Sequence, residues 1–157
     1  MLVFVDADTT VPRETLRQAV RAIERGAAGG GAGVRFDGWV PLYARVMVAM
    51  LVRLFRMLKL TGGCFLFCTR EAFDASGGWD ERYFVGEEIH MCKAIKRIGK
   101  FVILREPVVT SGRKMRTHSA REVLGTLARL SLQGMKGGRT REGKEMWYGE
   151  RRADVGR

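Results

Sequence analysis

Residues 2–5 form an apolar run that ends abruptly in two carboxylates, Asp6 and Asp8. Four consecutive apolar residues between polar neighbours are typical of a strand buried on both faces, as in a parallel sheet. Ligands of open α/β sheets bind at the carboxyl ends of such strands. Alternation along an extended chain would place both carboxylates on one side, where they could share a divalent cation or contact a phosphate. The alternative is a solvated turn in which Asp8 or Thr9 caps a helix.

Composition indicates one globular domain with an anionic partner. The chain has 157 residues, of which 46% are hydrophobic, and this is enough to bury a core. Its net charge of +11 implies phosphates, nucleic acid or an acidic membrane surface as the partner. Three cysteines (Cys64, Cys68 and Cys92) form no dense framework, which predicts reduced thiols and a cytosolic setting.

Hydrophobic spacing and turn residues predict alternating helices and short strands. The triple glycine at 29–31 lacks the following Lys-Ser/Thr of a P-loop, so we expect a flexible linker there. The expected elements are helices over 12–25, within 40–60, over 87–98 and beyond Ser119, and strands at 2–5, 32–36, 64–68, 101–104 and 108–109. The charged residues after 137, with Trp147 and Tyr148, predict a poorly ordered or docked tail.

The most hydrophobic segment, residues 40–60, is interrupted by Arg45, Arg53, Arg56 and Lys59. On a helix these cations fall within roughly 120° of arc and leave a wide apolar face opposite. Each such charge would cost about 2.5–3.5 kcal/mol at the centre of a bilayer, which excludes a transmembrane span. The segment is either an amphipathic helix lying on a membrane surface or a helix that covers the core of the protein itself.

Two further stretches contain candidate catalytic or phosphate-binding residues. Glu87 and Glu88 open a helix, where the helix dipole stabilises carboxylates and keeps them ionised, so either could act as a general base. Arg113 and Lys114 follow a strand end and suit a phosphate or diphosphate, with a solvated basic turn as the alternative. Because the only histidines are His90 and His118, at no zinc-like spacing, we expect no zinc site.

Taken together, four motifs resemble the later half of a family 2 glycosyltransferase of the GT-A fold. They are residues 5–9, the pair Gly62 and Gly63, the loop 77–81, and residues 86–88. Their order and spacing match the family across residues 2–115, although no single motif is specific. The resemblance implies a GT-A-like (Rossmann-like) α/β fold over residues 1–115, a partial mixed sheet flanked by helices, followed by a C-terminal amphipathic helix and tail over 116–157.

In that family the Asp-x-Asp motif binds a divalent metal, Mn²⁺ or Mg²⁺, and the nucleotide diphosphate. The resemblance places this role on Asp6 and Asp8, with Asp8 as the direct metal ligand and Asp6 nearer the ribose. The family's acidic pair at a helix start carries the catalytic base and maps onto Glu87 and Glu88. Glu88 stands where aspartate is usual, and one added methylene moves the carboxylate.

The implied reaction moves a sugar from a nucleotide-diphosphate sugar to an acceptor hydroxyl with inversion. Glu88 would deprotonate the hydroxyl, while the cation, Arg113 and Lys114 would face the departing diphosphate. Members of the family often act at membranes on lipid-linked acceptors, so we expect a lipid-linked or small-molecule acceptor, peripheral membrane contact and a place at the cytoplasmic face. The residues implied on the acceptor side are Gly62, Gly63, Trp79 and Asp80.

The family's first strands and helices, which hold the nucleotide base, would precede Leu2. We therefore expect that the N-terminal half of the domain is missing. The chain is then an inactive fragment, is completed by another chain, or has lost transfer activity.

Two other functions compete with transfer. Residues 6–11 also fit the opening motif of haloacid-dehalogenase-like phosphatases, with Thr110 or Ser111 as the second motif, but no acidic pair follows a later apolar strand. The non-enzyme alternative is a basic module that binds a membrane or nucleic acid. Because the cations are spread along the chain without a recognisable reading motif, we expect no nucleic-acid partner.

Overall fold

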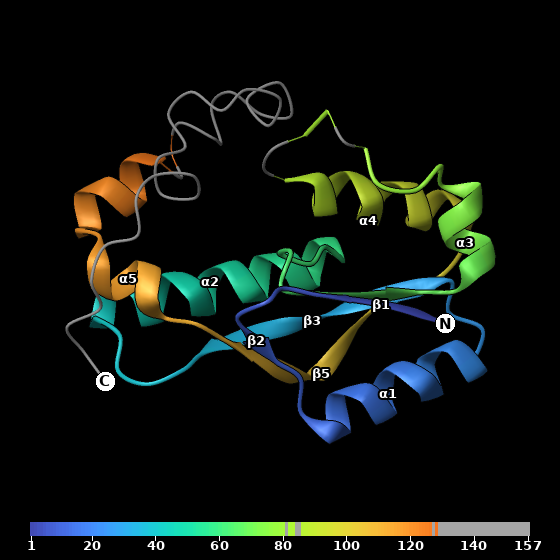
Figure 1. Cartoon of the computed structure of the whole chain (residues 1–157), viewed down its shortest axis with the longest axis horizontal. Coiled ribbons are helices and arrows are strands. Elements are labelled where there is room, and N and C mark those ends of the chain that lie inside the picture. Colours follow the sequence, from blue (N-terminus) through green and yellow to red (C-terminus); the bar gives the residue numbers. More distant parts are fainter. Residues whose placement is uncertain (81, 84–85, 127, 129–157) are drawn as a thin grey trace.

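The computed structural model describes residues 1–80, 82–83, 86–126 and 128, and a mixed five-stranded sheet lies at its centre (Figure 1). The strands follow the order β1-β4-β3-β5-β2, and β3 and β5 are parallel while the other neighbours are antiparallel. The elements are β1 (Leu2–Val5), β2 (Thr9–Thr10), α1 (Arg13–Glu24), β3 (Gly29–Phe36), α2 (Leu42–Leu58), β4 (Phe65–Cys68), α3 (Arg70–Ala75), α4 (Glu87–Ile98), β5 (Phe101–Thr110) and α5 (Arg113–Thr117). The prediction of an α/β fold with a mixed sheet flanked by helices is confirmed.

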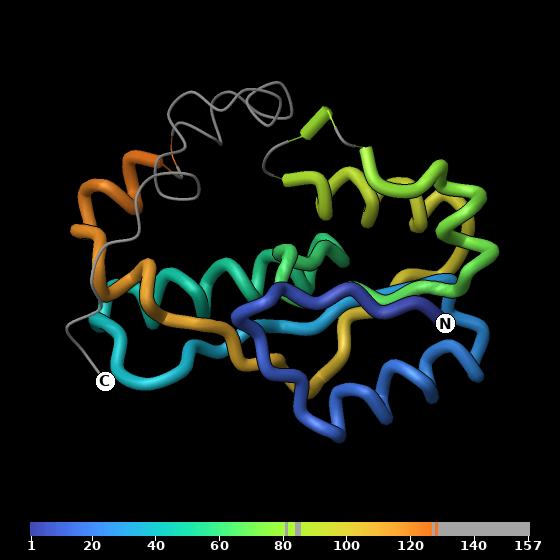
Figure 2. The backbone as a smooth tube through the Cα atoms, viewed as in Figure 1, coloured from blue at the N-terminus to red at the C-terminus, as the bar shows by residue number. Residues whose placement is uncertain are grey.

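Helices cover both faces of the sheet, with α1 on one side and α2, α3 and α4 on the other (Figures 1 and 2). The alternation of β4 builds the two cores. Phe65 and Phe67 point toward α1 and pack with Ala19, whereas Leu66 and Cys68 belong to the cluster formed by α3 and α4. All four of these β4 side chains are buried, so β4 is the strand that holds the layers together.

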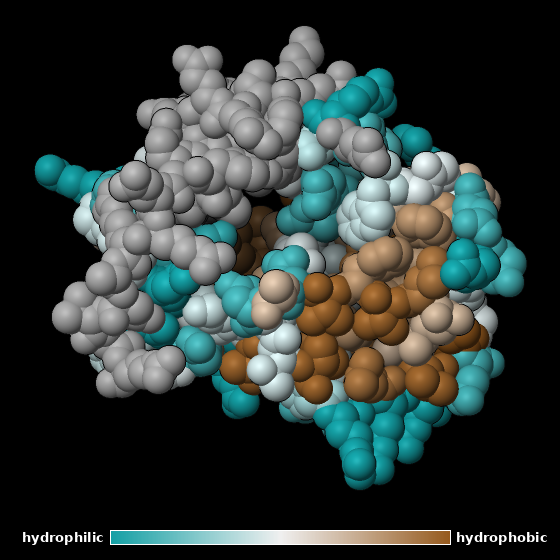
Figure 3. All heavy atoms as spheres, viewed as in Figure 1, coloured by the Kyte–Doolittle hydropathy of each residue, from teal (hydrophilic) through white to brown (hydrophobic). Residues whose placement is uncertain are grey.

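The prediction that β1 is buried on both faces of a parallel sheet is wrong. β1 is an edge strand with β4 as its one neighbour, and the two run antiparallel with Leu2 opposite Cys68. Its inward residues Leu2 and Phe4 pack against the α3–α4 cluster, while Val3 and Val5 are 37% and 43% exposed. A short apolar run does not reveal how many neighbours a strand has. Figure 3 shows hydrophobic side chains gathered over β1 and α1.

The triple glycine is not a flexible linker, because Gly29, Gly30 and Gly31 begin the central strand β3 and are buried. A Cβ atom on Gly30 would lie 2.6 Å from Cζ of Phe67, and one on Gly31 would lie 2.5 Å from Oγ1 of Thr61. Side chains from β4 and from the turn before it therefore fill the space over the strand. The glycines therefore allow close packing over the strand.

Two strands were expected around Pro107, but β5 is one continuous strand. The pairing of β3 with β5 shifts register between Ala32 and Val34, and Pro107 lies in the skipped stretch of β5. Proline has no N–H to donate to the ladder, and it is tolerated there because this stretch is not paired with β3. The short helix α3 was not predicted; its start is capped by Thr69, whose Oγ1 accepts from the Ala72 N–H at 3.0 Å.

The expected helices over 12–25, within 40–60 and over 87–98 are confirmed by α1, α2 and α4. The helix beyond Ser119 is present at residues 120–126, where Ser119 and Glu122 cap one another's N–H groups. The predicted tail, with Trp147 and Tyr148, lies outside the described residues. No helix in the described part of the chain combines the length and apolarity that crossing a bilayer requires.

Candidate active site

Four carboxylates from two distant segments converge beyond the end of β1, and we call them the acidic cluster: Asp6, Asp8, Glu87 and Glu88. Partial desolvation raises the pKa of Asp6, and the negative charge of Asp8 raises it further. Partial desolvation raises the pKa of Glu87, stronger desolvation raises that of Glu88, and the charge of Asp6 adds to both. The fold therefore brings the two acidic motifs of the sequence within electrostatic reach of each other.

Asp6 and Asp8 lie in a turn, so the expected extended alternation across them is wrong. The Thr9 N–H donates to the Asp6 carbonyl at 3.0 Å and closes the turn, after which β2 pairs with the end of β5. The Asp6 N–H donates to the Cys64 carbonyl at 3.4 Å, which ties the turn to the start of β4. Asp8 and Thr9 cap no helix, because α1 begins only after Pro12.

Glu87 and Glu88 form the first turn of α4, behind Gly86 in the left-handed conformation with φ 84°. Glu87 is exposed and Glu88 is half-buried. The helix dipole was expected to keep both acids ionised, but their pKa values are raised because desolvation outweighs it. A raised pKa makes Glu88 a stronger proton acceptor when it is ionised.

The glycine pair, Gly62 and Gly63, lies beside Glu88. Gly63 has a positive φ of 59°, and a Cβ atom there would lie 3.0 Å from Oε1 of Glu88. Gly62 faces the Phe55 ring of α2, which a Cβ atom would approach to 3.3 Å. The turn that joins α2 to β4 thus passes beside Glu88 with its backbone exposed to the carboxylate, and no side chain intervenes at Gly63.

Two residues take part in the site in ways that the sequence did not predict: Cys64 was expected only as a reduced thiol, and Thr110 only as part of the phosphatase motif. The Cys64 thiol lies beside the Asp6 carboxylate, whose pKa it lowers, and beside the Thr110 side chain, which lowers the pKa of the thiol. Burial raises the pKa of Cys64 to about 11, so the thiol stays protonated and can donate to Asp6. Thr110 in turn accepts from the Thr9 hydroxyl at 3.0 Å. No spacing in the sequence linked Cys64 to Asp6, because the contact depends on the pairing of β1 with β4.

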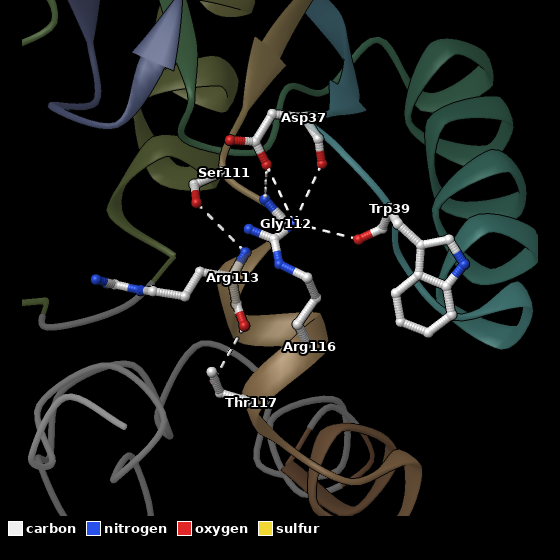
Figure 4. Close-up of polar contacts among 7 residues, drawn as sticks. All are labelled: Asp37, Trp39, Ser111, Gly112, Arg113, Arg116 and Thr117. Carbon is white, nitrogen blue, oxygen red and sulfur yellow. Dashed lines mark hydrogen bonds and ion pairs between the residues drawn. The ribbon is translucent and has the colours of Figure 1, made fainter. Parts of the chain in front are cut away.

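A basic turn at the start of α5 faces the acidic cluster. The positive charge of Lys114 lowers the pKa of Asp6, which places the ammonium near that carboxylate. Arg113 begins α5, and its N–H donates to Oγ of Ser111 at 3.3 Å. Its side chain points away from the neighbouring polar network (Figure 4). Cations and carboxylates therefore share one end of the sheet.

The basic turn is anchored by Asp37, which follows β3 (Figure 4). Oδ1 of Asp37 accepts from the buried Gly112 N–H at 2.7 Å and from Nη1 of Arg116 at 3.4 Å. The same Nη1 also donates to the carbonyls of Asp37 and Trp39, each at 3.2 Å. The Arg116 side chain is only 9% exposed, so this network fixes where α5 begins.

Trp79 and Asp80, expected on the acceptor side, have local structural partners. The Trp79 ring packs edge-on against Phe4 with centroids 5.1 Å apart, and it belongs to the α3–α4 core. Arg82 forms a bidentate ion pair with Asp80, with two contacts of 2.8 Å, and these hydrogen bonds hold the pKa of Asp80 at about 2. These contacts explain the positions of the Trp79 and Asp80 side chains without a bound ligand.

The acidic cluster could supply oxygen ligands to a metal ion, but its side chains would not complete the coordination of that ion. Among the described residues, no group of three or more His, Cys, Asp or Glu side chains could hold a metal ion. Carboxylates are the ligands that Mg²⁺ and Mn²⁺ prefer, and Mg²⁺ is usually held by one or two carboxylates together with water and substrate phosphates. The donor set therefore fits a cation that arrives with a diphosphate.

A hollow of about 560 Å³ lies away from the carboxylates, between α2 and the end of β3. It is lined mainly by apolar side chains, with Arg35, Trp39 and Arg45 at its polar positions. A smaller hollow of about 140 Å³ shares Val48 and Val52 with it and extends to Gly62. The α2 side of the sheet is thus open along much of the helix.

Comparison of the chain with protein-family models, with curated proteins and with solved structures found no match. The family resemblance of the motifs stays a prediction, and the function has to be inferred from the residues that converge at the site.

Proposed function

We propose that the acidic cluster binds the diphosphate of a nucleotide-sugar together with a divalent cation, and that this chain belongs to a sugar-transferring catalytic domain like that of family 2 glycosyltransferases. The observation that carries the proposal is the convergence of Asp6 and Asp8 with Glu87 and Glu88, about eighty residues further along the chain, beside Lys114. Carboxylates next to a basic turn are what a cation and a diphosphate require.

Asp8 would ligate Mn²⁺ or Mg²⁺, with Asp6 beside it toward the ribose, and the diphosphate oxygens would complete the coordination. Bound there, the cation would neutralise charge on the diphosphate leaving group. Lys114 and Arg113 would add positive charge on the same side, and Asp37 fixes the turn that carries them. The Cys64 thiol, by donating to Asp6, would hold that carboxylate in place.

Glu88 is the proposed general base. No side chain from Gly63 covers the Glu88 carboxylate, and the raised pKa of Glu88 strengthens it as a proton acceptor. The acceptor oxygen would give its proton to Glu88 and bond to the anomeric carbon as the bond from that carbon to the diphosphate breaks. The nucleoside diphosphate leaves with the bonding electron pair, and the configuration of the sugar inverts.

Compartment and acceptor follow from the same proposal. All three cysteines are free, which accords with the reducing cytoplasmic side of a membrane. The acceptor would be a hydroxyl-bearing small molecule or a lipid-linked one.

The test is release of nucleoside diphosphate from UDP- and GDP-sugars in the presence of Mn²⁺ and a membrane lipid extract. Glu88→Gln should lower turnover at least about 100-fold while donor binding is kept, because general-base catalysis contributes about 10²–10⁴-fold. The matched control is Glu24→Gln, at the exposed end of α1. Equal turnover by both variants would contradict the assignment of Glu88.

A further inference from the structure

We propose that α2 docks on an anionic membrane surface through an apolar stripe on its outer face. The α2 stripe consists of Leu42, Val46, Met50, Leu54 and Met57. The docking does not depend on the proposed transfer reaction, since it follows from exposure and charge along one helix.

The α2 stripe is the most exposed apolar feature of any described helix. Its side chains are between 46% and 80% exposed, and Trp39, just before the helix, is 72% exposed. Successive members are three or four residues apart, so they follow one side of the helix over roughly 120° of arc. Ala44 is the only fully buried residue of α2, so little of the apolar surface of this helix is buried in the core of the protein.

Positive charge borders the stripe, and no residue of α2 itself is acidic. Arg45, Arg53, Arg56 and Lys59 are all exposed. Arg56 also donates to the carbonyls of Leu104 and Arg105, at 3.2 and 2.9 Å, which fixes this flank of the helix against β5. Apolar residues beside a row of cations match the interface of a bilayer that contains anionic lipids.

The geometry favours a bilayer surface over the other occupants of such a face. A helix of 17 residues is about 25 Å long, too short and too charged to cross a bilayer. A second copy of the chain would bring two rows of cations together, in a protein whose net charge is already +11. An anionic lipid surface instead satisfies the cations and the apolar side chains at once.

Docking would also orient the candidate active site. The helix ends at Lys59, whose φ of 50° turns the chain into the segment that carries Gly62 and Gly63 beside Glu88. A membrane bound along α2 would therefore lie close to the proposed base, where an amphiphilic acceptor could reach it.

The experiment is cosedimentation of the full chain with phosphatidylcholine vesicles, with and without about one third phosphatidylglycerol. We expect binding to the mixed vesicles only, and Met50→Ser combined with Leu54→Ser should weaken it at least tenfold. The matched control is Leu16→Ser with Val20→Ser on α1, two side chains that are 39% and 43% exposed. Circular dichroism checks that both variants keep their helix content.

A second readout uses Trp39 as a reporter. Lipids brominated in their acyl chains should quench its emission on binding. Trp39→Phe should reduce the quenching of the total tryptophan emission, to which Trp79 and Trp147 also contribute, while leaving sedimentation within about threefold. Three results would overturn the proposal: equal binding to vesicles without phosphatidylglycerol, equal losses in the α1 and α2 variants, or a dimer in light scattering that the α2 variant dissociates.

Discussion

Replacing Asp37 by alanine should destabilise the protein and displace the basic turn. The variant leaves the buried Gly112 N–H without its acceptor at 2.7 Å, and a hydrogen bond to a charged group contributes about 1.5–3 kcal/mol. It also removes the ion pair with Arg116 at 3.4 Å, which contributes about 0–1 kcal/mol because the Asp37 side chain is 52% exposed. The expected total loss is about 1.5–4 kcal/mol in the free energy of unfolding.

Asp37→Asn keeps an oxygen acceptor but not the charge, so it should lose about 1 kcal/mol, since charge-assisted hydrogen bonds are roughly twice as strong as neutral ones. Urea denaturation followed by circular dichroism measures both, and with a slope of about 1–3 kcal/mol per molar urea the midpoint of the alanine variant should fall by about 1 M. The control is Asp74→Ala on α3, an exposed carboxylate expected to change stability by less than about 0.5 kcal/mol. If Asp37→Ala behaves like Asp74→Ala, the network in Figure 4 does not anchor α5.

Three further predictions concern stability. Glu88→Gln should be more stable than the wild type above about pH 4.5 and equal to it below. The pKa of Glu88 is raised in the folded state, so the wild-type protein loses stability as the pH rises past the ordinary pKa of a glutamate. Urea midpoints from pH 3.5 to 8 test this, and a constant difference between the two proteins would refute it. Gly31→Ala should lower the free energy of unfolding by about 1–3 kcal/mol because its Cβ atom meets the buried Thr61 side chain. Gly125→Ala, with open space around it, should raise that free energy by about 0.5–1 kcal/mol. Equal urea midpoints for the two variants would contradict the close packing at Gly31. Thr69→Ala should cost about 1 kcal/mol in thermal unfolding through its lost cap, and an unchanged transition would show that α3 does not need it.

Helices were the most predictable part of the fold. The spacing of Leu16, Val20 and Ile23 predicted α1 to within a residue at its start, and Glu87 and Gly99 bracketed α4. Periodicity and terminal residues are local signals, so one sequence suffices to recognise them. The short helix α3 has no such period, and its cap at Thr69 was recognised only in the structure.

Strand neighbours were the least predictable part. The run 2–5 is apolar enough for a central strand, yet it lies at an edge because position in a sheet depends on partners distant in sequence. The glycines of β3 resembled a linker for the same reason, since the Phe67 and Thr61 side chains that require them come from other segments.

The candidate site was partly predictable. Asp6 and Glu88 each stand at the end of an element, where sequence patterns are informative, and the structure places them within electrostatic reach. Cys64 and Thr110 join the site only through the pairing of β1 with β4 and of β2 with β5. The pKa of Glu88 also depended on burial, which the helix dipole alone did not indicate.

Calorimetric titration of the chain with UDP- and GDP-sugars, with and without Mn²⁺, tests the central claim most directly. We predict metal-dependent binding that Asp8→Asn abolishes and that Asp74→Asn, a matched change on exposed α3, leaves intact. Absence of binding under every condition, or equal binding by the two variants, would contradict a diphosphate site at the acidic cluster.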